Sequence, residues 1–194
     1  MADPPLGILF VCTGNVCRSP YMEFRLRAML APARGGGVRV SSAGTRALEG
    51  HPMAEALAKR LHEQGIDASG FRARRLTAAA LDEVGMVITA TREHRREVVH
   101  AGGSGLAERT FTLAQLARLL GTTAPHGEDQ AGVALTVDDI VSEALAARGR
   151  GSGAALGDDD LDDPWQRSRR RYRRVADRMD ELLRPLAGRL GAQG

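Results

Sequence analysis

Residues 8–22, ILFVCTGNVCRSPYM, decide the fold of this chain of 194 residues. The first four residues of the stretch are apolar and predict a short buried strand that ends at Cys12. A tight loop follows, and Pro20, which has a fixed φ and no amide hydrogen, suits the first turn of a helix. A strand, a loop and a helix in this order direct backbone N–H groups and a helix N-terminus at one point. The stretch therefore predicts an anion-binding loop.

The two ends of this loop carry a thiol, Cys12, and a guanidinium, Arg18. Aligned N–H dipoles, a helix N-terminus and a nearby arginine lower the pKa of a cysteine, so Cys12 is the candidate nucleophile. Arg18 offers a planar fork that holds two phosphate oxygens into the transition state. Ser19 can donate a hydrogen bond to the sulfur, Gly14 lets the backbone curl around an anion, and Asn15 tolerates a left-handed conformation. The predicted phosphate-binding residues are Thr13, Gly14, Asn15, Val16, Cys17, Arg18 and Ser19.

The string V-C-T-G-N-V-C-R-S-P resembles the phosphate loop of the low-molecular-weight protein tyrosine phosphatases, which are related to thioredoxin-coupled arsenate reductases. The sequence SSAGT at residues 41–45, and the pair Asp163-Pro164 followed by Trp165, match the same family. The resemblance implies a single phosphatase domain over residues 1–194, with a probable insertion at about 121–157. The implied fold is α/β, with three layers (α/β/α) around a mostly parallel four-stranded sheet, as in phosphotyrosine phosphatase I.

The resemblance also selects the general acid. Five aspartates crowd into residues 158–163, and the family's acid directly precedes a proline, which points to Asp163, with Asp162 as the alternative. Pro164 restricts Asp163 to extended conformations, in agreement with that choice. In the implied reaction Cys12 attacks phosphorus, a phosphocysteine forms, and Asp163 protonates the leaving phenolate and then activates water. Trp165 is expected to stack on the phenyl ring, or else to pack against the last helix.

The expected partner is a phosphotyrosine protein, with inorganic phosphate or similar oxyanions as inhibitors. No metal or cofactor is expected, because the loop dipoles and Arg18 supply the positive field. Three alternatives stay open: a phosphatase acting on a small phosphate ester, an arsenate reductase that uses an external thiol, and a phosphate-binding module without catalysis. Cys17, five residues from Cys12, is a candidate partner for a reversible disulfide that protects the nucleophile.

The composition indicates a cytoplasmic bacterial protein. The chain has two cysteines, both in the loop, which is typical of a reducing compartment, and it shows no signal peptide or apolar run of membrane-spanning length. Its single lysine beside many arginines, with abundant alanine and glycine, indicates a GC-rich bacterial genome. The net charge is +3, and the arginines at residues 167–174 are interpreted as the outer face of a docked helix. We therefore expect neither nucleic acid nor membrane as a partner.

Apolar periodicity predicts the remaining elements. Ser42, at the end of the second strand, is expected either to hold the phosphate loop, as the resemblance implies, or to bond its own turn. His94 is interpreted as part of a solvated helix face. The predicted helices cover residues 20–31, 53–64, 92–100, 113–120, 138–148 and 167–190, with a short helix after Thr77, and the predicted strands after the first cover residues 38–42, 86–90 and 110–112.

Overall fold

The computed structural model describes residues 7–31, 38–121, 134–150 and 159–192. Its sheet has four strands in the order β2-β1-β3-β4, and all neighbouring strands pair in parallel, which confirms the predicted α/β fold. The predicted edge strand at residues 110–112 lies at the edge of the sheet. The strands are β1 (Gly7–Cys12), β2 (Val40–Gly44), β3 (Val84–Thr89) and β4 (Thr110–Thr112).

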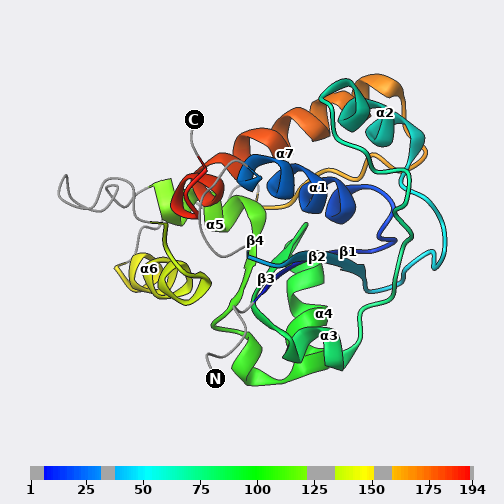
Figure 1. The fold of residues 1–194 in the computed structure, drawn as a ribbon. Helices are drawn as coiled ribbons and strands as arrows, with labels where there is room; N and C mark the ends of the chain where they lie inside the picture. The colour runs from blue at the N-terminus through cyan, green and yellow to red at the C-terminus, as the bar shows by residue number, and fades with distance from the viewer. Residues whose placement is uncertain (1–6, 32–37, 122–133, 151–158, 193–194) are drawn as a thin grey trace, which may run out of the picture.

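Helices cover both faces of this sheet (Figure 1). The first group, on one face, comprises α1 (Arg18–Leu30), α2 (Glu55–Glu63), α5 (Leu113–Gly121) and α7 (Arg169–Arg189). The second group, on the other face, comprises α3 (Ala78–Asp82), α4 (Arg92–Gly102) and the 3-10 turn η1 (Ser104–Leu106). The three predicted layers are therefore present, and each predicted helix lies within a few residues of its expected position.

Strand β1 shows why both faces must be covered. Side chains along a strand alternate between its faces. Ile8 and Phe10 belong to the larger apolar cluster, together with α1, α5 and α7, whereas Leu9 and Val11 belong to the cluster under α3 and α4. All four side chains are buried, so the strand reads as an uninterrupted apolar run, as expected for parallel sheets.

The topology places the phosphate loop at a switch point. The chain leaves β1 through α1 to reach β2 on one side, and it later returns to β3 on the other side of β1. Connections that diverge in this way leave a crevice at the carboxyl end of the central strand. Residues 13–17 occupy that position, between the last residue of β1 and the first residue of α1.

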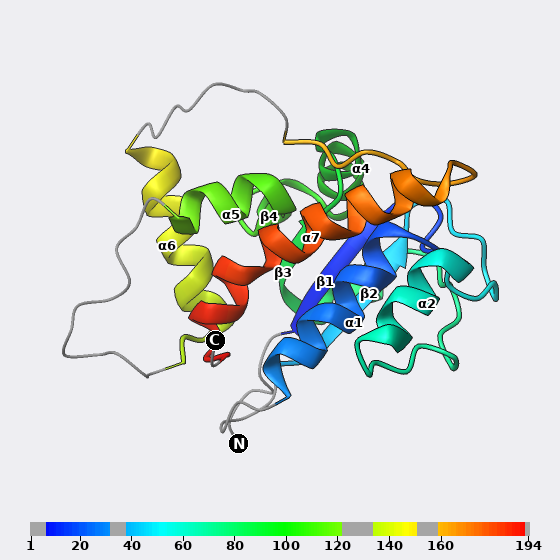
Figure 2. The same cartoon turned by 90° about the horizontal axis from the view of Figure 1, so that it is seen from above.

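The predicted insertion at 121–157 lies partly outside the described residues, because residues 122–133 and 151–158 are not described. Its middle forms α6 (Val137–Gly149), which packs beside α5 (Figure 2) and begins with a capping box between Thr136 and Asp139. The helix predicted at 138–148 is confirmed, whereas the interpretation of this segment as an insertion stays a prediction. Across the described ranges, no helix is both long enough and apolar enough to cross a membrane.

Candidate active site

Backbone hydrogen bonds fix the direction of the loop's amide groups. The carbonyls of Cys12, Thr13 and Gly14 accept hydrogen bonds from the N–H groups of residues 45, 46 and 48, at 2.9 to 3.0 Å. In a planar trans peptide the carbonyl of one residue and the N–H of the next point in opposite directions. The N–H groups of residues 13, 14 and 15 therefore point away from the segment 45–48. This arrangement provides the donors that the sequence predicts for an anion site.

Asn15 holds the loop in shape from inside. Its φ is 53°, the left-handed conformation predicted from the sequence, and its side chain is fully buried. Its amide nitrogen donates to Ser19 Oγ and Ser42 Oγ, each at 2.9 Å, and its carbonyl oxygen accepts from the backbone N–H of Arg74 at 2.9 Å. Ser42 in turn donates to a carboxylate oxygen of Glu23 at 2.5 Å. The bond from Asn15 confirms that Ser42 helps to hold the phosphate loop.

The predicted nucleophile lies beside a hydroxyl. Cys12 Sγ is 3.0 Å from Ser19 Oγ, and both side chains are buried. The Ser19 oxygen accepts from Asn15, and its own proton lies within reach of two acceptors, the Cys12 sulfur at 3.0 Å and the Ala43 carbonyl at 3.3 Å. Hydrogen bonds from such donors stabilise a thiolate more than a thiol. Ser19 thus occupies the place that the sequence assigns to it.

Arg18 is the most constrained cation of the site, with a relative exposure of 4%. Its Nη2 lies 2.9 Å from Oδ2 of Asp163, and its Nη1 donates to the carbonyl of Leu161 at 3.2 Å. The Nε–H of the same guanidinium is buried and has no hydrogen-bond partner among the described residues. A buried N–H without an acceptor is costly, so this group is available to a ligand oxygen.

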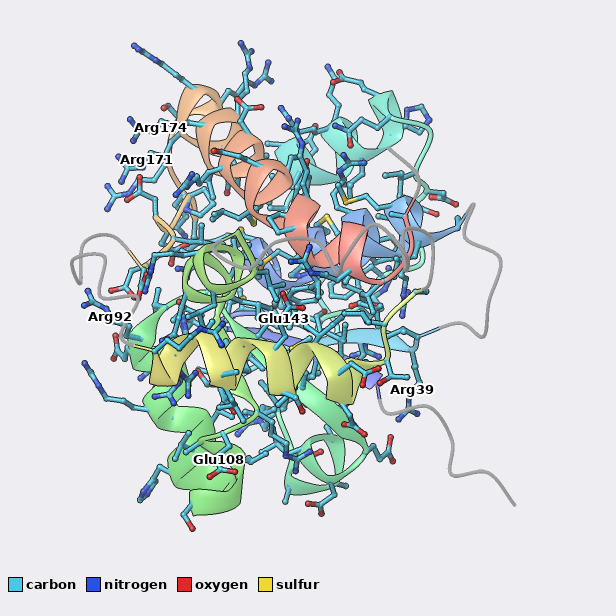
Figure 3. The ribbon with its side chains drawn as sticks, turned by 90° about the vertical axis from the view of Figure 1, so that its left-hand side faces the viewer. Arg39, Arg92, Glu108, Glu143, Arg171 and Arg174 are labelled. Carbon is cyan, nitrogen blue, oxygen red and sulfur yellow. The ribbon has the colours of Figure 1, made fainter. Side chains whose placement is uncertain are left out.

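The acid loop, residues 159–163, is held by ion pairs to four different elements. A backbone hydrogen bond adds to these ion pairs: the N–H of Leu161 donates to the carbonyl of Ala90, the residue that follows β3, at 2.9 Å. In Figure 3, Arg171 and Arg174 on α7 lie above Arg92, at the start of α4, along one edge of the molecule. The pairs are Asp159 with Arg118, Asp160 with Arg92, Asp162 with Arg171 and Arg174, and Asp163 with Arg18.

These pairs place the two candidate acids differently. Asp162 pairs with arginines on the outer surface of α7, whereas Asp163 is half exposed and lines the same cavity as Cys12 and Arg18. The pairs of Arg171 and Arg174 also support the reading of residues 167–174 as the outer face of a docked helix. The catalytic role of Asp163 stays a prediction.

A cavity of about 170 Å³ opens over the phosphate loop. Trp165 lines its mouth with 40% of its surface exposed, and its backbone N–H donates to Asp163 Oδ1 at 3.1 Å. Trp165 is therefore accessible to a ligand in the cavity, and its stacking on a phenyl ring stays a prediction. The cavity is lined by Cys12, Thr13, Gly14, Val16, Cys17, Arg18, Arg46, Leu48, Asp163 and Trp165.

The second cysteine differs chemically from the first. Cys17 Sγ donates to Tyr172 Oη on α7 at 4.0 Å. Burial, as the largest cause, raises the pKa of the Cys17 thiol to about 12, and burial likewise raises the pKa of Tyr172 to about 12. Cys17 is therefore protonated at neutral pH. The disulfide between Cys12 and Cys17 stays a prediction.

His94 corrects the sequence analysis, which placed it on a solvated helix face. Its side chain is buried, and its Nε2 lies 2.8 Å from the hydroxyl oxygen of Thr13 in the phosphate loop. Burial, followed by the charge of Arg18, lowers the pKa of the ring below its ordinary value. Topology could have found this residue, because α4 begins where β3 ends, at the same edge of the sheet as the loop.

Comparison with known proteins agrees with this geometry. The model of a family described as low molecular weight phosphotyrosine protein phosphatase matches residues 7–143. The probable low molecular weight protein-tyrosine-phosphatase EpsP of Ralstonia solanacearum is 36% identical over 91 residues, which are 47% of this chain and 59% of that protein. A protein-arginine-phosphatase of Geobacillus stearothermophilus is 37% identical over 111 residues, 57% of this chain and 71% of that protein.

A solved structure supports the fold. The tyrosine phosphatase Wzb from Escherichia coli K30, in complex with sulphate, aligns with a TM-score of 0.66 and 20% identity, over 96% of this chain and 99% of that one. The family match covers more than half of the chain and includes the phosphate loop. This chain therefore belongs to the low molecular weight phosphotyrosine protein phosphatase family.

Proposed function

We propose that this protein is a cysteine-dependent phosphatase that hydrolyses phosphotyrosine in proteins through a phosphocysteine intermediate. The observation that carries the proposal is the guanidinium of Arg18. It is buried beside Cys12 and Asp163, and its Nε–H lacks an acceptor among the described residues. A phosphoryl oxygen supplies that acceptor, and its negative charge strengthens the hydrogen bond to the guanidinium.

In the first step, Cys12 Sγ attacks phosphorus in line with the leaving oxygen. The S–P bond forms while the P–O bond to tyrosine breaks, and Asp163 gives its proton to the phenolate. The loop N–H groups and Arg18 hold the equatorial oxygens, whose charge they stabilise. In the free protein Asp163 pairs with Arg18 as a carboxylate. The arriving phosphoryl group replaces it on that edge of the guanidinium, and the released carboxylate takes up a proton from solvent, which it then gives to the phenolate.

In the second step, the Asp163 carboxylate takes a proton from water, whose oxygen attacks phosphorus. The S–P bond breaks, inorganic phosphate leaves and the thiolate is regenerated. Ser19, 3.0 Å from the sulfur, stabilises the thiolate as it leaves. Inorganic phosphate and similar oxyanions are therefore expected to inhibit competitively, in line with the sulphate bound in the Wzb structure.

The walls of the cavity favour an aromatic substrate. Val16, Leu48 and Trp165 give it an apolar rim, and Trp165 presents a face on which a phenyl ring can stack. A phosphoarginine side chain is the second candidate, because the Geobacillus relative is a protein-arginine-phosphatase. A guanidinium would have to enter an apolar mouth that already contains the cations Arg18 and Arg46, which disfavours this candidate.

The test compares kcat/KM for one peptide sequence carrying phosphotyrosine, phosphoarginine or phosphoserine, with para-nitrophenyl phosphate as a small ester. We expect phosphotyrosine to be hydrolysed best. A higher kcat/KM for phosphoarginine would transfer the assignment to the second candidate. Activity on small esters without activity on any peptide would indicate a small-molecule phosphatase. If the protein hydrolyses none of these phosphate compounds, the remaining candidates are thiol-dependent arsenate reduction and phosphate binding without catalysis.

We further propose a single phosphatase domain over residues 1–194 in the cytoplasm of a bacterium. The relatives described above are bacterial proteins. A cysteine nucleophile needs a reducing compartment, and both cysteines are free thiols. Fractionation of the source cells followed by immunoblotting tests the location, and recovery of the protein in an extracytoplasmic fraction would contradict it.

A further inference from the structure

Three side chains form a hydrogen-bonded path from the start of α4 to the phosphate loop. Thr91 Oγ1 lies 2.7 Å from His94 Nδ1, and His94 Nε2 lies 2.8 Å from Thr13 Oγ1. His94 is buried, and Thr13 lines the catalytic cavity. A neutral imidazole donates from one ring nitrogen and accepts at the other, so the protons along this path must point in a consistent direction.

The helix cap favours one direction. Thr91 is the N-cap of α4, and its Oγ1 accepts the backbone N–H of His94 at 3.3 Å. Its hydroxyl proton still needs an acceptor, and within the described ranges the hydroxyl has no hydrogen-bond partner besides the backbone N–H and Nδ1 of His94. If Thr91 donates to Nδ1, the proton of the ring lies on Nε2, which then donates to Thr13 Oγ1. The reverse direction leaves the Thr91 proton without an acceptor among these residues.

The same chain of donors leaves the Thr13 proton free. In this arrangement Thr13 Oγ1 accepts from His94, so its own O–H does not point back at the ring. Because Thr13 lines the cavity over Cys12 and Arg18, rotation of the hydroxyl can direct that proton at a ligand there. With the opposite tautomer, Thr13 would donate to Nε2 and offer the cavity only lone pairs, which would repel an oxyanion.

We infer that Thr13 donates its hydroxyl proton to a phosphoryl oxygen of the bound substrate, and that His94 is the positioning residue that sets this polarity through its Nε2–H tautomer. The inference rests on the proposed function, which it extends from the loop backbone and Arg18 to a side-chain donor. The ring stays neutral, as a tautomer requires, because burial and the charge of Arg18 lower its pKa against the weaker opposing effects of Glu97, Glu93 and Asp163.

The first test is nitrogen-15 NMR of histidine-labelled protein, with and without inorganic phosphate at pH 7.5. The His94 signals are assigned by their loss in His94→Gln. We expect the proton of His94 on Nε2 in the phosphate complex. A proton on Nδ1 in that complex would overturn the inference, whatever the catalytic activity.

The second test measures the affinity for inorganic phosphate by calorimetry in Thr13→Val, Thr13→Ser, His94→Gln and the double variant Thr13→Val/His94→Gln. A hydrogen bond to a charged group gives Thr13→Val an expected loss of affinity of about tenfold or more. Thr13→Ser, which keeps the hydroxyl, should retain most of the parent affinity. The double variant should bind no more weakly than Thr13→Val, because His94 acts through Thr13. His100→Asn, exposed on the same helix, is the matched control and should bind like the parent.

Unchanged phosphate affinity in Thr13→Val would overturn the inference, and so would fully additive losses in the double variant. If His94→Gln fails to fold, the phosphate affinities of Thr13→Val and Thr13→Ser still decide. None of these measurements requires turnover. If the parent protein binds phosphate in the expected way but hydrolyses no phosphate ester, the proposed function is contradicted. The inference about Thr13 and His94 as phosphate-binding groups would still hold.

Discussion

At the scale of single residues, Asn15 stabilises the conformation of the phosphate loop through several hydrogen bonds of one small side chain. It adopts a left-handed backbone conformation and makes three hydrogen bonds, buried ones to Ser19 and Ser42 and a partly buried one to the backbone of Arg74. Alanine would remove all three and leave the Arg74 backbone N–H without this acceptor. We expect Asn15→Ala to lower the free energy of unfolding by about 2–4 kcal/mol and to reduce kcat/KM strongly.

Urea denaturation and steady-state kinetics measure both effects. Ser41→Ala on the neighbouring β2 is the control, because that serine makes one weak bond, to the Ile8 carbonyl at 3.4 Å. Its expected cost is below about 1 kcal/mol. Equal stability of Asn15→Ala and Ser41→Ala would show that the loop does not depend on Asn15.

Cys17 should be almost inert towards alkylating agents. Because its pKa is raised to about 12, only about one molecule in ten thousand carries a Cys17 thiolate at pH 8, and the thiolate is the reactive form. In the Cys12→Ser variant, iodoacetamide at pH 8 should therefore label the folded protein far more slowly than the urea-unfolded protein. Mass spectrometry of the loop peptide measures the two rates, and similar rates would contradict the account of Cys17.

His94 should make the fold sensitive to acid. Its pKa is lowered in the folded protein, whereas the unfolded chain has the ordinary value of about 6.5. Below that pH the unfolded state binds a proton that the folded state resists, so stability falls as the pH drops through this range. The loss in free energy of unfolding between pH 7.5 and pH 5.5 should therefore be smaller in His94→Gln than in the parent. An equal loss in both proteins would exclude this contribution.

At the scale of elements, the acid loop shows how one segment is fixed by several others. Each of the described aspartates between residues 159 and 163 pairs with arginine from a different element, which leaves Asp163 facing the phosphate loop. The pair of Asp159 with Arg118 on α5 is largely buried, with side-chain exposures of 6% and 26%. The pair of Asp160 with Arg92 is exposed on both sides. The two pairs therefore form a matched comparison.

Asp159→Asn should cost about 2 kcal/mol or more, because it leaves Arg118 without a counter-charge in a desolvated place. Asp160→Asn should cost less than about 1 kcal/mol, as is usual for exposed pairs. Because the same loop carries Asp163, Asp159→Asn should also lower kcat on a phosphotyrosine peptide more than Asp160→Asn does. Urea denaturation and steady-state kinetics test the order of the two variants, and a reversed order would show that the buried pair does not anchor the loop.

At the scale of the whole molecule, local patterns predicted the individual elements well because the strands are short, apolar and bounded by turn residues, and the family resemblance supplied their arrangement. The run before Cys12 reads as a buried strand in the sequence and is one in the structure. Asn15 was also predictable, since asparagine tolerates the left-handed conformation, whereas the sequence left two roles open for Ser42 and the structure chose between them. These predictions needed only neighbours along the chain or the family pattern.

His94 and the partners of the acid loop could not be predicted in the same way. The residues around His94 read as a polar helix, and its partner in the phosphate loop lies 81 residues earlier in the chain. Apart from the proline that follows Asp163, the aspartates of the acid loop have similar sequence surroundings, and the sequence does not show which distant arginine the tertiary fold brings to each of them. Contacts of this kind depend on how α4, α5 and α7 meet the sheet, which no local pattern contains.

The central claim is that Cys12 carries the phosphoryl group between the two steps, and trapping that intermediate tests it most directly. Para-nitrophenyl phosphate has a good leaving group, so Asp163→Asn should still complete the first step, whereas the second step lacks its base. We therefore predict that rapid acid quenching of Asp163→Asn with this substrate, followed by mass spectrometry, finds one phosphoryl group per protein on Cys12. Phosphate on any other residue, or turnover that survives in Cys12→Ser, would contradict the account.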